Sequence, residues 1–238
     1  NFLKKIAKKK NLKVISFGIN NNLSNIKLLK IKKNLSKIKL IVGINNAKKT
    51  FIINQDLEPY LINILASITV LSQFFDLKQI SQNIFSNFKI PNARGNLFKV
   101  SFNKKSILIT DESYNSNPLS LNFAIRNFDN IKTKRKKILI LSDMLELGKF
   151  SKKLHIDSAR YINKTKINKV YVYGNYVKDL FRNLVKNKKG EIFKNKNEIY
   201  QFVRKNIDNN YHFMFKGSNS TGLQEVVSNI KKRKVYAL

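Results

Sequence analysis

The chain has 238 residues, of which 47 are Lys or Arg and 14 are Asp or Glu, so its formal net charge is +33. Hydrophobic residues make up 42%, which is enough for a globular protein with one large core or two ordinary ones. The absence of cysteine excludes disulfides, and two histidines, His155 and His212, argue against a histidine-built zinc site. The apolar run 62–70 is shorter than the roughly 20 residues of a membrane span, so none is expected.

The positive charge first suggests a nucleic-acid partner. Its distribution argues against that interpretation, because the lysines are spread along the whole chain, arginines are few, and Asn and Ile are also abundant. Lys, Asn and Ile share AT-rich codons, so the base composition of the genome could produce this bias. A nucleic-acid site, by contrast, is expected to show a localised stripe with Arg and interleaved aromatics. The sequence therefore predicts no nucleic acid as the main partner. Attraction of phosphorylated substrates remains a by-product of the charge.

The first ninety residues begin with helical spacing and then change to alternating apolar and polar positions punctuated by Asn, Ser and Gly. This alternation predicts an antiparallel meander. In chain order we expect a helix over 2–10, a buried strand over 14–17, strands over 26–31, 38–44 and 50–53, and helices over 60–75 and 77–88.

Pro91 marks the best domain boundary, because proline forces the preceding residue out of the helical region. We therefore divide the chain into domains 1–90 and 91–238. In the second domain strands and helices alternate, which predicts an α/β fold with a Rossmann-like, mostly parallel sheet and helices on both faces. The expected strands cover 98–102, 107–110, 137–141, 170–173, 192–193 and 212–215, and the helices start at 118 and cover 151–165, 175–185, 198–207 and 223–232.

The segment 111–118, DESYNSNP, follows a strand and opens a helix. Asn117 suits the N-cap and Pro118 the first helical position. An ordinary cap needs no more than this, but Asp111, Tyr114 and two amides within seven residues exceed what capping requires. Since ligands bind at the carboxyl edge of parallel sheets, Asp111 is a candidate acceptor for ribose hydroxyls.

The segment 142–148, SDMLELG, also follows a strand. Its carboxylates Asp143 and Glu146 stand out in so basic a chain and are candidate site residues. The alternative is a connecting loop in which Met144 and Leu145 pack under the sheet and the closing glycine supplies a positive φ. For the two apolar residues we adopt this alternative.

The segment 216–222, KGSNSTG, lies between a strand and a helix. Its backbone amides, with Lys216, Ser218 and Ser220, could form an anion cradle at a helix N-terminus, although a flexible capped loop has the same pattern. The segment 43–50 resembles a phosphate-binding loop, but lysine replaces its second glycine and a strand follows it, so we reject it. We interpret both histidines as structural.

These segments resemble motifs of the UDP-MurNAc-tripeptide–D-alanyl-D-alanine ligases, within the Mur ligase family. Residues 111–118 resemble D-x-x-YNANP with Ser116 in place of alanine, 142–148 resemble GDMLELG, followed at the expected distance by His155, and 216–222 resemble KGS-x-S-x-G. Upstream, 93–95 resembles a GRG motif, and Asn63 opens a stretch similar to the family's NALA. The DYAHTP-type motif of the related third-residue ligase is absent, which favours the D-Ala-D-Ala enzyme.

The resemblance implies a cytoplasmic, monomeric ligase of peptidoglycan synthesis, and so of cell-wall biogenesis, cell shape and cell division. Its cofactors are ATP and Mg²⁺, and it joins UDP-MurNAc-tripeptide to D-Ala-D-Ala through an acyl phosphate. It also implies residue roles. The expected nucleotide contacts are Arg94, Asp111, Tyr114, Asn115, Asn117 and Asn63, and the expected substrate contacts are Lys216, Ser218, Ser220, Asp143 and Glu146.

The family's GTNGKT phosphate loop, its magnesium-binding glutamate and histidine, and its UDP-sugar domain have no counterpart in this sequence. Residues 1–90 are therefore expected to be the second half of the central ATPase domain. We expect no catalytic or metal-binding residue within this chain, and no ligase activity from it alone. The alternatives are a non-catalytic nucleotide- or polyanion-binding module, or another amino-acid ligase of the same superfamily.

Overall fold

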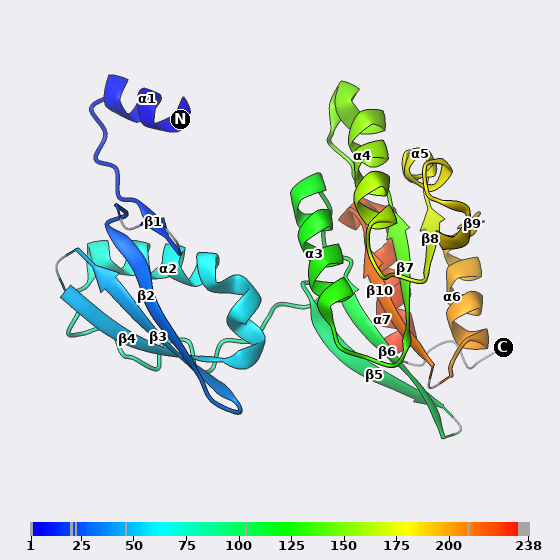
Figure 1. Ribbon diagram of the computed structural model, residues 1–238, viewed down its shortest axis with the longest axis horizontal. Helices are drawn as coiled ribbons and strands as arrows, with labels where there is room; N and C mark the ends of the chain where they lie inside the picture. The colour runs from blue at the N-terminus through cyan, green and yellow to red at the C-terminus, as the bar shows by residue number, and fades with distance from the viewer. Residues whose placement is uncertain are drawn as a thin grey trace. The chain divides into compact units, whose positions relative to one another are not determined.

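The computed structural model describes residues 2–19, 21, 23–45, 47–102, 104–208 and 210–232. The chain forms two compact units, Asn1–Lys89 and Ile90–Leu238, and each is described by itself (Figure 1).

The first unit is built on the antiparallel meander that the sequence predicts. Strands β2 (Ile26–Lys33), β3 (Lys37–Ile44) and β4 (Ala47–Asn54) pair in chain order, and the two-residue strand β1 (Phe17–Gly18) pairs with β2 in parallel. Alternate β3 residues are buried, and helix α2 (Leu61–Phe74), entered through the 3-10 turn η1 (Gln55–Tyr60), buries one face in the same unit. In the rejected phosphate loop, residues 43–44 pair with residues 47–48 in the β3–β4 hairpin.

Two expectations for this unit are wrong. The strand expected over 14–17 is reduced to β1, and residues 77–88 form successive turns rather than a helix. Side chains compete with helical hydrogen bonding there, since the Asp76 carboxylate accepts from the Lys78 amide and the Ser81 hydroxyl from the Asn83 amide. The turns lie along the β4 edge, where the Ile52 amide donates to the Gln82 carbonyl oxygen at 2.8 Å.

Helix α1 (Phe2–Lys9) confirms the first expected helix and buries none of its residues. By length and composition alone, the 20-residue helical stretch Gln55–Phe74 could cross a membrane, which qualifies the expectation from the sequence. A third of its most apolar window is buried (33%), with Leu65 and Ile68 in the core, and core helices of soluble proteins pass the same test.

The second unit contains a six-stranded sheet in the order β5-β6-β10-β7-β8-β9. Every pairing in it is parallel except that of β5 with β6, which confirms the predicted α/β class with a mostly parallel sheet. The strands are β5 (Asn96–Phe102), β6 (Lys105–Glu112), β7 (Lys136–Ser142), β8 (Lys169–Tyr173), β9 (Lys189–Phe193) and β10 (Tyr211–Lys216).

Helices cover both faces of this sheet (Figure 1). The alternation along β7 decides which side chain faces which layer: Leu139 and Leu141 join one core, Ile138 and Ile140 the other. The first core includes α3 (Pro118–Asn130), α4 (Ser151–Asn163) and α5 (Val177–Arg182), and the second includes α6 (Lys196–Lys205) and α7 (Leu223–Lys232).

The last strand, β10, lies between β6 and β7, and its following helix packs on the face opposite α3 and α4. The loops after these three adjacent strands therefore leave the sheet toward different faces. Such a change of direction opens a crevice at the carboxyl edge of an α/β sheet, where ligands bind. The three segments singled out from the sequence are these loops.

Candidate functional site at the carboxyl edge

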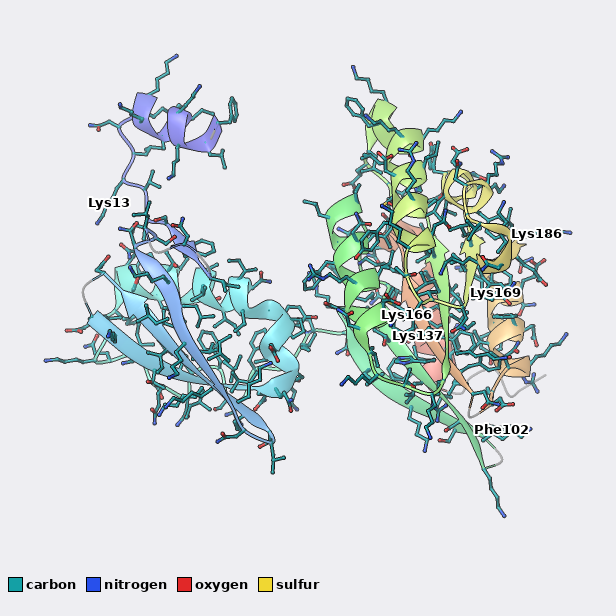
Figure 2. The ribbon with its side chains drawn as sticks, viewed as in Figure 1. Lys13, Phe102, Lys137, Lys166, Lys169 and Lys186 are labelled. Carbon is teal, nitrogen blue, oxygen red and sulfur yellow. The ribbon has the colours of Figure 1, made fainter. Side chains whose placement is uncertain are left out.

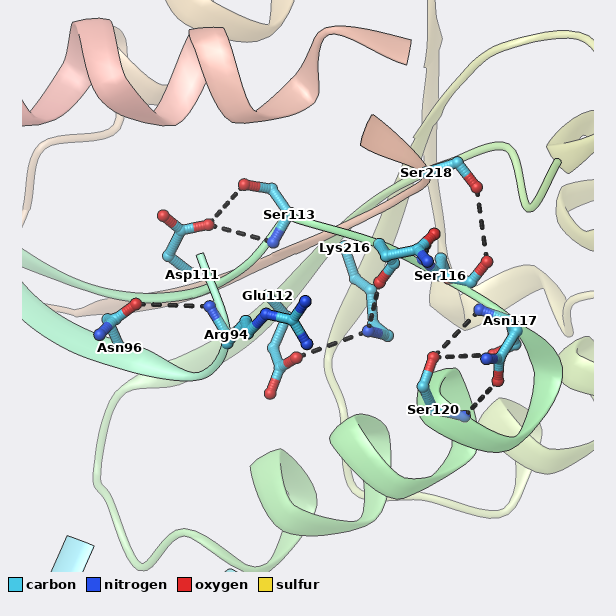
Figure 3. A network of polar contacts seen from close by, with 11 residues as sticks. Arg94, Asn96, Asp111, Glu112, Ser113, Ser116, Asn117, Ser120, Lys216 and Ser218 are labelled. Atoms are coloured by element: carbon cyan, nitrogen blue, oxygen red, sulfur yellow. Dashed lines mark hydrogen bonds and ion pairs between the residues drawn. The ribbon is translucent and has the colours of Figure 1, made fainter. Parts of the chain in front are cut away.

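The β6–α3 loop ends in the helix cap that its sequence predicts. The Asn117 side chain accepts from the Ser120 amide at 2.8 Å, the Ser120 hydroxyl accepts from the Asn117 amide at 3.0 Å, and Pro118 occupies the first turn (Figure 3). This reciprocal capping box satisfies two helix-terminal amides. Asn117, a predicted nucleotide contact, thus uses its side chain to start α3.

Asp111 shapes the beginning of the same loop. Its carboxylate accepts from the Ser113 hydroxyl at 2.5 Å and from the Ser113 amide at 3.1 Å, and the residue is 8% exposed. Burial raises the pKa of this carboxyl, against the lowering effect of the Ser113 bonds. One carboxylate oxygen therefore serves the turn itself, which leaves the other as the candidate ligand acceptor.

Arg94 is fixed against this loop by backbone hydrogen bonds on either side of it. The Gly95 amide donates to the Asp111 carbonyl oxygen at 2.7 Å, and the Tyr114 amide donates to the Ala93 carbonyl oxygen at 3.0 Å. The Arg94 guanidinium carbon lies 4.1 Å from the centre of the Tyr114 ring, a cation–π arrangement, and Tyr114 remains 39% exposed. The structure thus brings two of the predicted nucleotide contacts together.

Lys216 lies beneath the β6–α3 loop rather than on the surface of its own loop. Its ammonium donates to the Asn115 carbonyl oxygen at 2.9 Å and lies 3.5 Å from the Glu112 carboxylate, and the residue is 2% exposed. Burial lowers the pKa of Lys216, and burial also raises the pKa of Glu112. The anion cradle expected from 216–222 therefore does not include an exposed lysine ammonium.

Glu112 is a site residue that the sequence reasoning missed. Burial dominates both pKa shifts; the charge of Arg94 opposes the rise at Glu112 and adds to the fall at Lys216, so the three charges influence one another at the end of β6 (Figure 3). The signal was the register of two parallel strands, in which Lys216 pairs with Glu112. Strand order cannot be obtained from residue spacing, so the pair was not visible in the sequence.

Asp143 in the β7–α4 loop is a structural cap. Its two carboxylate oxygens accept from the Val177 amide at 2.7 Å and from the Asn175 amide at 3.0 Å, so it fixes the start of α5. Gly174 is required beside it, because a Cβ there would lie 2.5 Å from the Asp143 carboxylate and φ is +137°. Glu146 is exposed, and Gly148 has the predicted positive φ of 54°.

His155 hydrogen-bonds to the β7–α4 loop from helix α4, in agreement with its interpretation as a structural residue. Its Nδ1–H donates to the Ser151 carbonyl oxygen at 2.8 Å, so Nε2 is left to accept from the Met144 amide at 3.2 Å. Met144 is buried as predicted, whereas Leu145 is half-buried.

Ser218 joins the three loops. Its amide donates to the Asp143 carbonyl oxygen at 3.0 Å, its hydroxyl accepts from the Leu145 amide at 2.9 Å, and the hydroxyl is 3.4 Å from the Ser116 carbonyl oxygen. The residue is 6% exposed, so its hydroxyl and amide are used between loops and do not point to solvent. Ser220, by contrast, is exposed and borders a cleft of about 440 Å³.

The predicted site residues therefore separate into two groups. Arg94, Asp111, Tyr114, Asn115 and Lys216 gather at the end of β6. Asp143 and Ser220 border the cleft, which is also lined by the β8–α5 and β9–α6 connections. Asn63 belongs to α2 in the first unit and is exposed. Among the described residues, no group of three or more His, Asp or Glu side chains could hold a metal ion.

The second unit is thus an α/β domain with a switch point and with interlocked loops at its carboxyl edge, where proteins of this architecture bind ligands. The sequence profile described as "Mur ligase, glutamate ligase domain" matches residues 98–219, about half of the chain. The chain therefore belongs to the Mur ligase family.

Curated relatives point to one branch of that family. The chain is 27% identical over 173 residues to the UDP-N-acetylmuramoyl-tripeptide–D-alanyl-D-alanine ligase of Bacillus subtilis, covering 71% of this chain and 37% of the relative. With the Haemophilus influenzae enzyme of that name it shares 29% identity over 149 residues, which cover 59% and 30%. The chain thus spans about a third of the length of these relatives.

Solved structures agree in fold. A MurF ligase from Thermotoga maritima in complex with ADP superposes with a TM-score of 0.72 at 18% identity, covering 98% of this chain and 53% of that one. A MurF from Acinetobacter baumannii gives a TM-score of 0.75 at 17% identity, covering 98% and 50%. At these identities the likeness concerns the fold of both units alone.

Proposed function

We propose that this chain is part of an ATP-dependent amide-bond ligase that adds D-Ala-D-Ala to UDP-MurNAc-tripeptide in the cytoplasm. The observation that carries the proposal is the connection of its three motif loops, through Ser218 and Lys216, at the ends of adjacent strands. The names of the curated relatives supply the substrates.

In this proposal ATP supplies the phosphoryl group that activates the tripeptide carboxylate as an acyl phosphate, which the D-Ala-D-Ala amine then attacks with release of phosphate. Catalysis of this kind depends on positioning and on neutralising phosphoryl charge. Arg94 suits the second task, because a guanidinium is a fixed, permanently charged donor. The Tyr114 ring supports the guanidinium, whose carbon lies 4.1 Å from the centre of the ring.

In the proposal Lys216 acts through the loop that it supports, and Asp111 contacts the nucleotide directly. Lys216 fixes the Asn115 carbonyl and so the conformation of the Tyr114–Asn115 turn. Asp111 keeps one carboxylate oxygen for a ribose hydroxyl while the other holds Ser113. Among the described residues no group of three or more acidic or histidine side chains could hold a metal ion, and no step of the proposal depends on Mg²⁺.

The test uses the protein encoded by the longest open reading frame that contains this chain. ATP-dependent phosphate release is measured with UDP-MurNAc-tripeptide, with and without D-Ala-D-Ala. Release that needs both substrates supports the ligase, and Arg94→Ala should then lower kcat/KM at least about 100-fold. The matched control is Lys152→Ala on the exposed face of α4, which should change nothing. A folded protein that releases no phosphate with any dipeptide would reject the proposal and favour a binding module.

A further inference from the structure

A second cleft, of about 520 Å³, lies at the amino edge of the second unit's sheet, where the connections into β7 and β8 arrive. Six of its eleven lining residues are Lys or Arg, whereas the whole chain has 47 in 238. The general basicity of the sequence therefore does not account for this concentration. The six are Lys132, Lys134, Arg135, Lys136, Lys137 and Lys166 (Figure 2 labels Lys137 and Lys166).

Two of these cations have structural tasks. The Lys137 ammonium donates to the Asp129 carbonyl oxygen in the last turn of α3, where a cation is favoured by the helix dipole. Arg135 donates to the Ser106 carbonyl oxygen at 2.8 Å and so ties β7 to β6. Neither needs a ligand to explain its position.

The other four, Lys132, Lys134, Lys136 and Lys166, are exposed. The cleft has one carboxylate among its described lining residues, that of Asp129, and this accepts from the Lys166 amide at 2.8 Å. Burial lowers the pKa of Lys137, the Asp129 carboxylate opposes this, and the charge of Lys166 adds to it, so like charges act on one another in the cleft. An anion would relieve this repulsion.

The shape and chemistry of the cleft select the kind of anion. The volume of the cleft lies within the roughly 300–1,000 Å³ range of small-molecule sites. The cleft is also concave, unlike a protein face that binds a nucleic-acid duplex. No aromatic side chain occurs among its described lining residues, so a nucleobase would find no stacking platform. We propose that this cleft binds a small oligophosphate through the four exposed lysines, independently of the carboxyl-edge site. A free polyphosphate and the phosphate tail of a nucleotide share this chemistry.

The experiment is calorimetric titration of tripolyphosphate into the 238-residue chain at constant ionic strength. The cleft variant is Lys134→Glu/Lys166→Glu, and the matched control, with the same change of net charge, is Lys152→Glu/Lys153→Glu on α4. We expect Kd to rise at least about tenfold in the cleft variant and less than about twofold in the control. The tenfold rise should persist in the Arg94→Gln background, in which the phosphate contact proposed at the carboxyl edge is removed. Circular dichroism melts check that every variant is folded.

Equal weakening in both double variants would overturn the proposal, because net charge alone would then explain binding. Loss of binding in Arg94→Gln would overturn it by placing the anion at the carboxyl edge, and this outcome would leave the proposed ligase function intact. Titration of ATP into Arg94→Gln distinguishes the two sources of the anion. If ATP binds as tightly as tripolyphosphate, the phosphate tail of a nucleotide is sufficient for binding. If ATP binds more weakly, the ligand is a polyphosphate without a base. Tight binding of a single-stranded oligonucleotide without binding of tripolyphosphate would also refute it.

Discussion

Acid should destabilise the second unit through His212, which is fully buried on β10. One ring nitrogen lies 2.9 Å from the Thr110 hydroxyl, and Nδ1 has no hydrogen-bond partner among the described residues. The ring also packs edge-on against Phe128, with centroids 4.8 Å apart. Burial, followed by the charges of Lys137 and Arg135, lowers the pKa of His212 from 6.5 to about 4.

The sign and size of the effect follow from this shift. Because the pKa is lower in the folded than in the unfolded chain, the neutral ring contributes stability above pH 6.5, and this is lost as the pH falls through about 4. By linkage, the free energy of unfolding should fall by about 2.5 kcal/mol between pH 7 and pH 4.5 from His212 alone. That is a large part of the roughly 5–15 kcal/mol that stabilises a typical domain.

Hydrogen exchange at the β10 amides, followed by mass spectrometry at both pH values, measures this quantity within the second unit. His212→Gln keeps a hydrogen-bonding group toward Thr110 and does not titrate. The wild type should lose about 2.5 kcal/mol more than this variant between pH 7 and pH 4.5, since other titrating groups are common to both. The same loss in the two proteins would show that His212 is not held neutral by its surroundings.

Three further predictions concern the carboxyl edge, each measured as the urea unfolding of the second unit. Ser218→Ala should cost about 1–3 kcal/mol, because the Leu145 amide loses its buried acceptor, whereas Ser220→Ala should stay within about 0.5 kcal/mol; equal effects would contradict the loop connection. Gly174→Ala should cost about 3 kcal/mol or more through its positive φ and the clash with a neighbouring carboxylate, and a neutral result would refute that geometry. Lys216→Met should cost about 3 kcal/mol by leaving the half-buried Glu112 carboxylate and the Asn115 carbonyl without the ammonium, and a stabilised variant would contradict the pairing.

Elements of the second unit could be predicted because their signals are local. β7 is an almost unbroken apolar run, buried on both faces, and a capping box with Pro118 opens α3. The helix predicted over 77–88 was wrong for an equally local reason. Apolar spacing alone favoured a helix there, but Asp76 and Ser81 use their side chains to form turns. Periodicity does not register this competition.

The candidate site was only partly predictable, because its contacts join segments far apart in the chain. Placing the three motifs at a carboxyl edge required only strand–loop–helix order, but the insertion of β10 between β6 and β7 is a property of the whole sheet. Without that order, Glu112 could not be paired with Lys216, nor Ser218 with Leu145. Exposure also depends on tertiary contacts, so the burial of Lys216 under the β6–α3 loop could not be predicted from its motif.

The burial of Lys216 and Ser218 changes how the motif residues are to be understood. These side chains are 2% and 6% exposed and hold neighbouring loops, so a loss of activity on their substitution would not by itself identify a substrate contact. Both residues connect loops, whereas Arg94, Tyr114, Ser220 and the second carboxylate oxygen of Asp111 remain the candidate ligand contacts. A structural role predicts that Ser218→Ala lowers stability and kcat together, with rescue by Thr but not by Val, which lacks the hydroxyl. A direct contact predicts a rise in KM with the free energy of unfolding unchanged.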